Sequence, residues 1–234
     1  MTRPEIPAGH ERVRTYKPRR GRVTGSQATA LARSWARLGV RIPFVEEQAR
    51  ALDLPALFGR RAPVVLEIGA GMGETTAAMA AADPLRDVLA VDVHTPGLGN
   101  LIKLVEATGL TNVRVADGDA LVLLRAMLSP GSLDEVRVFF PDPWPKARHA
   151  KRRLVTSGFA DLVASRLTSG GRLHIATDWE PYAAATRSVL AAHPHFALLD
   201  GGFTPRPVHR PVTRFERQAA AGGRRVADVM AIRR

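Results

Sequence analysis

Hydrophobic and polar residues follow a regular order from about residue 64 onward. Short apolar runs of strand length recur, and segments with apolar residues at helical spacing lie between them. The predicted strands are 64–68, 88–93, 113–116, 136–140, 172–176, 196–199 and 226–232. The predicted helices are 74–82, 98–108, 120–128, 154–167 and 182–193. Strands that alternate with helices form a doubly wound sheet, so we expect an α/β domain with seven mostly parallel strands.

The first 62 residues have a different pattern. Residues 1–25 contain seven Arg or Lys and two Glu, interrupted by Pro and Gly, which predicts a mobile basic arm. Ser26 is the predicted cap of a helix that runs to Leu38. A link over 42–62 with a short helix near 46–52 follows, and we expect residues 26–234 to form a single domain.

Composition narrows the function classes. The net charge of +12 favours a polyanionic partner such as nucleic acid. The absence of cysteine excludes disulfides and thiolate metal sites. No apolar run approaches the roughly 18 residues that span a bilayer, and the N-terminus has no apolar signal core. We therefore expect a cytoplasmic protein with no membrane partner.

A glycine motif follows the first strand of the alternating region. Glu67, Gly69, Gly71 and Gly73 are spaced Glu-x-Gly-x-Gly-x-Gly. Glycine allows a tight turn and the close approach of a ligand. The spacing differs from the Gly-x-Gly-x-x-Gly of dinucleotide folds, and an acid here would repel a pyrophosphate but suit a cationic amino-acid end. The motif resembles motif I of class I S-adenosylmethionine (AdoMet) methyltransferases; the alternative is a turn whose glycines serve packing alone.

Carboxylates follow the next two strands, at the edge where such sheets bind ligands. Asp92 ends the strand after the glycine motif, and a carboxylate there can accept hydrogen bonds from ribose hydroxyls. Asp119 can accept a hydrogen bond from an adenine amino group. Asp117 is the competing candidate, or a residue that only shapes the turn.

The fourth strand of this region leads into a rigid loop. Two prolines flank Asp142 in Phe-Phe-Pro-Asp-Pro-Trp, and rigid placement is what a catalytic carboxylate needs. Five Lys or Arg lie within 146–153, which predicts a phosphate-binding strip. Farther along are Asp178, within Ala-Thr-Asp-Trp-Glu-Pro-Tyr, and the segment Arg-Pro-Val-Thr-Arg-Phe-Glu at 210–216.

Taken together, these motifs are similar to those of the bacterial tRNA (guanine-N7)-methyltransferase family over about residues 12–230. The resemblance implies AdoMet as methyl donor and a guanine of the tRNA variable loop, usually tRNA position 46, as acceptor; it implies no metal. The implied AdoMet contacts are Glu67, Gly69, Gly71, Gly73, Asp92, Asp119 and Asp142, with Asp142 also catalytic. The implied substrate contacts are Lys146, Asp178, Thr213, Arg214, Phe215 and Glu216. The implied RNA contacts are Arg148, His149, Ala150, Lys151, Arg152 and Arg153.

The sequence departs from this family at three places. Asp92 stands where the family usually has Glu, Arg214 stands where Lys is usual, and the segment after Glu216 diverges. Two other functions fit parts of the pattern. Exocyclic-amine methyltransferases carry a similar loop, Asp/Asn-Pro-Pro-aromatic, whereas this chain has a proline before Asp142. An RNA-binding protein without catalysis is the second alternative, and the intact glycines and Asp142 argue against it.

Overall fold

The computed structural model describes residues 21–234, and within them the chain forms one eight-stranded sheet. The strands are β1 (Gly39–Arg41), β2 (Val64–Ile68), β3 (Asp87–Asp92), β4 (Val113–Asp117), β5 (Leu133–Phe139), β6 (Leu167–Thr177), β7 (Phe196–Leu198) and β8 (Ala227–Arg233). Their order is β1-β4-β3-β2-β5-β6-β8-β7, and β8 runs antiparallel to the other strands. The doubly wound, mostly parallel sheet is therefore confirmed.

The predicted count of seven strands was wrong by one, because β1 was missed. This strand has three residues directly after a helix and is too short to show a period of two. It pairs with β4 at the edge of the sheet, so its position depends on a partner more than 70 residues away. The basic arm predicted for 1–25 lies mostly outside the described residues.

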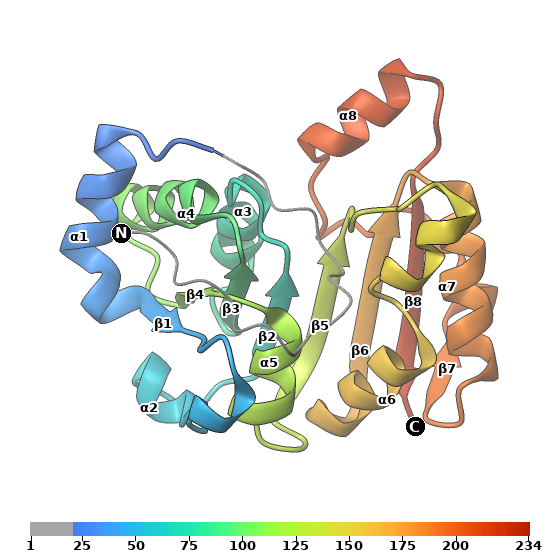
Figure 1. The fold of residues 1–234 in the computed structure, drawn as a ribbon, viewed down its shortest axis with the longest axis horizontal. Coiled ribbons are helices and arrows are strands. Elements are labelled where there is room, and N and C mark those ends of the chain that lie inside the picture. Colours follow the sequence, from blue (N-terminus) through green and yellow to red (C-terminus); the bar gives the residue numbers. More distant parts are fainter. Residues whose placement is uncertain (1–20) are drawn as a thin grey trace.

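Helices cover both faces of the sheet (Figure 1). They are α1 (Gly25–Leu38), α2 (Leu54–Phe58), α3 (Glu74–Ala82), α4 (Thr95–Thr108), α5 (Ala120–Val122), α6 (Ser157–Arg166), α7 (Glu180–Ala192) and α8 (Arg214–Ala221). Strand β2 is buried along its whole length, and its side chains alternate between two cores. Val65 packs with α1, α3 and α4, whereas Leu66 and Ile68 pack with α2, α6 and α7.

Several helix boundaries differ from the prediction. Thr24, and not Ser26, caps α1, because Thr24 and Gln27 form a reciprocal capping box. The helix predicted near 46–52 is a 3-10 turn, η1 (Glu46–Gln48), and α2 follows it. Helix α8 was not predicted: it has eight residues, of which only Ala219 is buried. Its eight residues are fewer than the window over which a helical period is usually recognised in a sequence.

The parallel strands end at one edge of the sheet, which is the upper edge in Figure 1. There β2 and β3 are paired up to Ile68 and Val91, and β3 and β4 up to Asp92 and Asp117. Helix α8 rises above this edge, beyond β5 and β6 (Figure 1). Every helix of the described chain is too short or too polar to cross a bilayer.

Candidate active site

A cavity of about 890 Å³, counting the part open to solvent, lies at the carboxyl edge of the sheet. The loops after β2, β3, β4 and β5 line it, and Phe215 of α8 completes the wall. Of the predicted site residues, the lining includes Gly69, Gly71, Asp92, Asp119, Asp142 and Phe215. Apolar side chains form most of the remainder, so the cavity suits a small organic ligand held by a few polar groups.

The three glycines of the motif have different surroundings. All three have a positive φ, of 85° at Gly69, 59° at Gly71 and 83° at Gly73. A Cβ at Gly69 or Gly71 would meet no protein atom within 4 Å, whereas one at Gly73 would lie 2.6 Å from Cβ of Leu101. Gly71 thus keeps space open on the cavity side, and Gly73 allows α4 to pack closely. A second close approach is at Gly97, where a Cβ would lie 1.8 Å from the carbonyl oxygen of Gly71.

Asp92 ties the glycine loop to the end of β3. Its Oδ2 accepts a hydrogen bond from the Gly71 amide at 2.8 Å, and its Oδ1 accepts one from the His94 amide at 2.9 Å. A carboxylate has about four acceptor positions, so capacity for two ribose hydroxyls remains. The shorter side chain of Asp is sufficient here, because the backbone amides approach it directly.

Glu67 lies behind the glycine loop and does not line the cavity. Its side chain is buried, and within the described chain its Oε2 has no hydrogen-bond partner. Burial raises the pKa of Glu67, although the nearby guanidinium of Arg137 opposes this shift. A buried acceptor without a partner costs stability. Glu67, which the resemblance implies as an AdoMet contact, therefore lies outside the cavity lining.

The structure separates the two acidic candidates after β4. Asp119 lines the cavity, and its Oδ1 accepts a hydrogen bond from the Leu121 amide at 2.8 Å, which caps α5. Asp117 does not line the cavity and forms an ion pair with Arg41 of β1 at 3.5 Å. Asp119 is therefore the better placed of the two for an adenine contact.

The loop that carries Asp142 has an unusual backbone. Phe140 has a φ of 51° and Trp144 a φ of 43°, values that are rare and costly for aromatic residues. The loop is held at both ends: the Phe140 amide donates to the Ala176 carbonyl at 2.7 Å, and Arg153 Nε donates to the Pro143 carbonyl at 3.0 Å. Asp142 lies between these fixed points and lines the cavity.

Both tryptophans near the site belong to the interior. Trp144 is buried, with the Arg152 guanidinium 5.0 Å from its ring centre and the His149 ring at its edge. Trp179 packs against the main core. Trp144 therefore organises the basic strip instead of offering an open stacking face.

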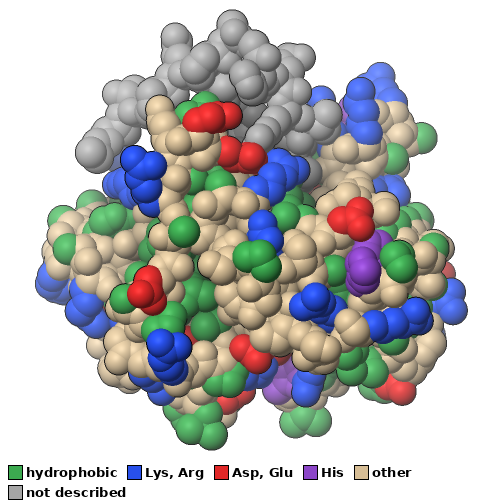
Figure 2. Space-filling model, turned by 90° about the horizontal axis from the view of Figure 1, so that it is seen from below, with side chains coloured by type: hydrophobic (Ala, Val, Ile, Leu, Met, Phe, Trp, Pro, Cys, Tyr) green, Lys and Arg blue, Asp and Glu red, His purple; other side chains and the backbone are tan. Residues whose placement is uncertain are grey.

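Most of the basic strip is exposed. It forms a short 3-10 helix, η3 (Ala147–Arg152), and Lys146, Arg148, Ala150, Lys151 and Arg152 face solvent. Arg153 differs, because its guanidinium lies over Tyr182 and holds the Asp142 loop. Seen from the side opposite α8, Lys and Arg are scattered among acidic and apolar side chains (Figure 2).

The remaining predicted substrate residues surround α8. Thr213 caps the helix by accepting a hydrogen bond from the Glu216 amide at 3.0 Å. Asp178 forms an ion pair with Arg224 at 3.0 Å, which links it to the divergent segment after Glu216. Phe215 is 40% exposed and stacks on Phe140, with ring centres 5.6 Å apart.

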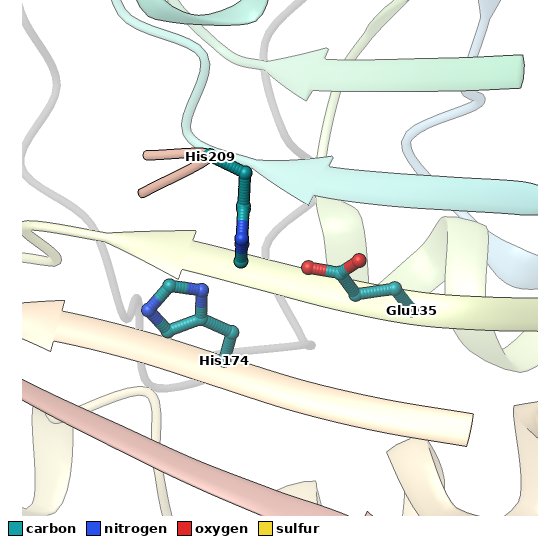
Figure 3. A group of neighbouring side chains, drawn as sticks. All are labelled: Glu135, His174 and His209. Carbon is teal, nitrogen blue, oxygen red and sulfur yellow. The ribbon is translucent and has the colours of Figure 1, made fainter. Parts of the chain in front are cut away.

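A polar layer lies on the sheet below this region. Possible ligand atoms of Glu135, His174 and His209 lie within 4.8 Å of one another, and Figure 3 shows the His209 ring directed between the other two. Glu135 also accepts hydrogen bonds from Arg86 and Arg137. Burial alone would raise its pKa, but the two guanidinium groups outweigh burial and lower the pKa to about 2. Two positive charges on this carboxylate oppose a divalent cation, so we assign the cluster to an ionic network.

Two residues that shape this site have no role in the prediction from sequence. Phe140 was read only as part of a motif, because a positive φ at an aromatic residue has no sequence signal. Arg210 belongs to the motif over 210–216, but its partners lie on other elements, so the motif alone does not indicate its role.

Comparison with known proteins agrees with this geometry. A family model described as "Putative methyltransferase" matches residues 61–229. The chain is 56% identical to a tRNA (guanine-N(7)-)-methyltransferase of Streptomyces coelicolor, over 96% of this chain and 83% of the relative. It is 48% identical to the enzyme of that name from Nitrosospira multiformis, over 94% of each chain.

Solved structures agree on the fold. An aminoglycoside resistance methyltransferase superposes with a TM-score of 0.52 at 14% identity, covering 80% of this chain and 95% of its own. The antibiotic-resistance methyltransferase Kmr gives 0.51 at 16% identity, covering 82% and 96%. Because its identity to these relatives is high and extends over nearly the whole chain, the protein belongs to the family of tRNA (guanine-N(7)-)-methyltransferases.

Proposed function

We propose that this protein transfers a methyl group from AdoMet to N7 of a guanine in tRNA. The observation that carries the proposal is that Gly71, Asp92, Asp119 and Asp142 line one cavity, and that exposed cations begin four residues after Asp142. Family membership supports both the donor and the acceptor. A tRNA substrate also implies a cytoplasmic location.

The cofactor half of the cavity fits AdoMet. Gly69 and Gly71 leave space free of side chains, and Asp92 has acceptor capacity left for a ribose. Asp119 would accept from the adenine amino group, and the buried carboxylate of Glu67, behind the glycine loop, would attract the cationic end. When bound, AdoMet supplies a methyl group on a positively charged sulfur.

The acceptor atom, guanine N7, needs little chemical activation. Guanine N7 has an exposed lone pair and no proton to lose, so no general base is required. Attack on the methyl carbon breaks its bond to sulfur, and the positive charge moves to the base. Alignment of the two reactants can supply roughly 7–11 kcal/mol. The Asp142 carboxylate would accept hydrogen bonds from guanine N1–H and the amino group and offset the growing charge.

The exposed cations would hold the RNA. A guanine in folded tRNA has to leave its stack before its N7 reaches a cavity of this kind. Phosphate contacts from Arg148, Lys151 and Arg152 would fix the backbone while the base is drawn out. Phosphate contacts do not distinguish one base from another, so the residues of the cavity have to select guanine.

Mapping the methylated atom tests this proposal directly. Methylation at N7 makes the strand cleavable by borohydride and aniline, so we expect one new cleavage site in tRNA incubated with enzyme and AdoMet. A tRNA substituted with 7-deazaguanine keeps the Watson–Crick edge and loses only the acceptor atom; it should bind normally and accept no methyl. A product that carries methyl but resists cleavage would favour an exocyclic amine. Binding of AdoMet and tRNA without transfer would favour a non-catalytic role.

A further inference from the structure

Arg210 is a fully buried arginine that joins three segments of the acceptor half. Its side chain is 0% exposed. Nε and Nη2 donate to Oδ1 and Oδ2 of Asp228 on β8, at 2.8 and 2.7 Å. Nη1 donates to Oε2 of Glu216 in the first turn of α8, at 2.7 Å. One planar guanidinium thus connects the sheet to α8 with a geometry that lysine cannot reproduce.

We call Arg210 with its partners Asp228 and Glu216 the clamp, and the charges of these side chains stabilise one another. Burial would lower the pKa of Arg210, but hydrogen bonds to Asp228 and Glu216 raise it overall. Burial would raise the pKa of Asp228, but His174 and Arg210 outweigh burial and lower it. His174 Nε2 lies 2.7 Å from Asp228 Oδ1. A buried ion pair is weak evidence for stability, and fixing one geometry is its better-supported use.

The clamp fixes a helix that has few other attachments. Within the described chain, the interior contact of α8 is Ala219, and Arg224 pairs with Asp178 beyond its end. At its start, Glu216 accepts from Arg210 through Oε2 and pairs with Arg206 through Oε1 at 3.3 Å. Both carboxylate oxygens of Glu216 are therefore engaged by arginines.

The same guanidinium reaches the mouth of the cavity. Its central carbon lies 5.9 Å from the ring centre of Phe139 and 6.0 Å from that of Phe140. Phe140 precedes the Asp142 loop and stacks on Phe215, which follows the α8 cap. Phe140, Asp142 and Phe215 all line the cavity.

We infer that Arg210 is a positioning residue for methyl transfer. Through Asp228 and Glu216 it holds the first turn of α8, so that Phe215 stays against Phe140 where the base enters. Glu216 is then an anchor of this turn, and not a contact to the base. The inference rests on the proposed function for its kinetic part, whereas the placement of α8 can be measured without activity.

The first test replaces the planar guanidinium of Arg210 with an ammonium group, which keeps the positive charge. Arg210→Lys should lower kcat for tRNA methylation by about tenfold or more, because charge-assisted hydrogen bonds are lost. The KM for tRNA and the AdoMet affinity by calorimetry should stay near wild type. Arg114→Lys is the matched control: Arg114 is also buried, but it donates to the carbonyls of Leu57, Thr111 and Val113, far from α8. This control can lower the melting temperature but should leave kcat unchanged.

The second test reads the position of α8 itself. The chain has no cysteine, so Arg217→Cys places a single spin label on the exposed side of α8. In the Arg210→Lys background the label should become more mobile. A label at Ser188→Cys, exposed on α7, should not change in that background. Unchanged mobility at 217, together with wild-type kcat, would overturn the inference.

The third test separates an anchor from a base contact. Glu216→Gln keeps one acceptor oxygen for Arg210 Nη1 but loses the pair with Arg206, so an anchor predicts a partial loss of activity, whereas Glu216→Ala should behave like Arg210→Lys. A direct contact predicts equal loss in both, because an amide cannot accept from guanine N1–H and the amino group together. Equal losses would therefore reject the anchor role. If the wild-type enzyme fails to methylate N7, the proposed function fails, and the label mobility still tests the clamp.

Discussion

The two halves of the cavity are built by different means. In the cofactor half, carboxylates bind backbone amides close in sequence, as Asp119 does with Leu121, or one strand away, as Asp92 does with Gly71. In the acceptor half, arginine side chains join separate elements, as Arg210 does with Asp228 of β8 and Arg153 does with Pro143 of the Asp142 loop. The first half is fixed by backbone amides in the loops that follow neighbouring parallel strands. The second depends on side chains that meet only after the sheet has formed.

This difference suits the two ligands. AdoMet is one small molecule, and a rigid cradle of glycines and carboxylates can be shaped to it before it arrives. A tRNA presents a backbone of phosphates and a base that must move, so its site needs a wide charged surface and a fixed entrance. Variants that damage one half and spare the other are therefore the sharpest tests of the comparison.

The largest effect is expected at Asp142. Asp142→Ala should lower kcat by about 10²–10³, because a preorganised charge at the reacting base is lost. Binding of tRNA should change little, since the exposed strip supplies it. Single-turnover kinetics and filter binding measure the two quantities. Asp142→Asn keeps the shape and one acceptor, so it should fall between Ala and wild type; wild-type turnover in Asn would show that the negative charge is not needed.

Gly71→Val should come next and should affect AdoMet alone. The new side chain would enter the cavity and should weaken AdoMet binding by about tenfold to a hundredfold, the cost of overpacking a fitted site. Gly109→Val is the control, because Gly109 also has a positive φ, of 67°, with open space around it and lies away from the cavity. Both variants carry similar backbone strain. Calorimetry that finds equal affinities in them would place the ligand elsewhere.

The elements around the glycine motif are predictable from the sequence because their signals are local. The predicted segments 64–68 and 74–82 coincide with β2 and α3, because a buried strand and an alanine-rich helix have strong local signals. The spacing of Glu67, Gly71 and Asp92 is likewise local information. What the sequence does not show is that Gly73 serves packing against Leu101, since that contact crosses to another helix.

The acceptor half is less predictable from sequence. The prolines around Asp142 indicate a rigid loop, but the sequence of the loop does not indicate a positive φ at Phe140 and Trp144. Helix α8 has eight residues, fewer than the window over which a helical period is usually recognised. The sequence does not distinguish Arg210 from the many other arginines of this basic chain; only the structure shows its ion pairs with Asp228 and Glu216. Tertiary contacts decide these features, and local patterns do not contain them.

A smaller effect is expected from the basic strip. Reversal of Arg148, Lys151 and Arg152 to Glu should weaken tRNA binding and lower the log–log salt slope by about one unit for each lost phosphate contact. AdoMet affinity should not change. A control reverses three exposed arginines outside the strip, Arg50, Arg61 and Arg172, which alters the net charge equally. If the control flattens the salt slope as much as the strip variant, the effect is one of total charge.

The smallest effect is a gain in stability at Glu67. Burial raises the pKa of this carboxyl in the folded protein, so its charged form costs stability above that pKa, and stability recovers as the pH falls toward the unfolded value. Glu67→Gln removes the buried charge and should add about 1 kcal/mol at pH 8, with the gain shrinking as the pH is lowered; AdoMet affinity should fall. Urea unfolding at several pH values measures this.

For Glu135, in the same sheet, we expect the opposite dependence of stability on pH. Arginines lower its folded pKa to about 2 from 4.5, so its contribution is present above 4.5 and is lost as the pH falls toward 2. Glu135→Gln should therefore destabilise the protein at neutral pH, and the difference from wild type should shrink in acid. Glu67 and Glu135 are both buried glutamates, but only Glu135 has arginine partners for both oxygens. A loss of stability at pH 8 in Glu67→Gln would show that the attraction of Arg137 for this carboxylate outweighs the cost of burial, contrary to the prediction.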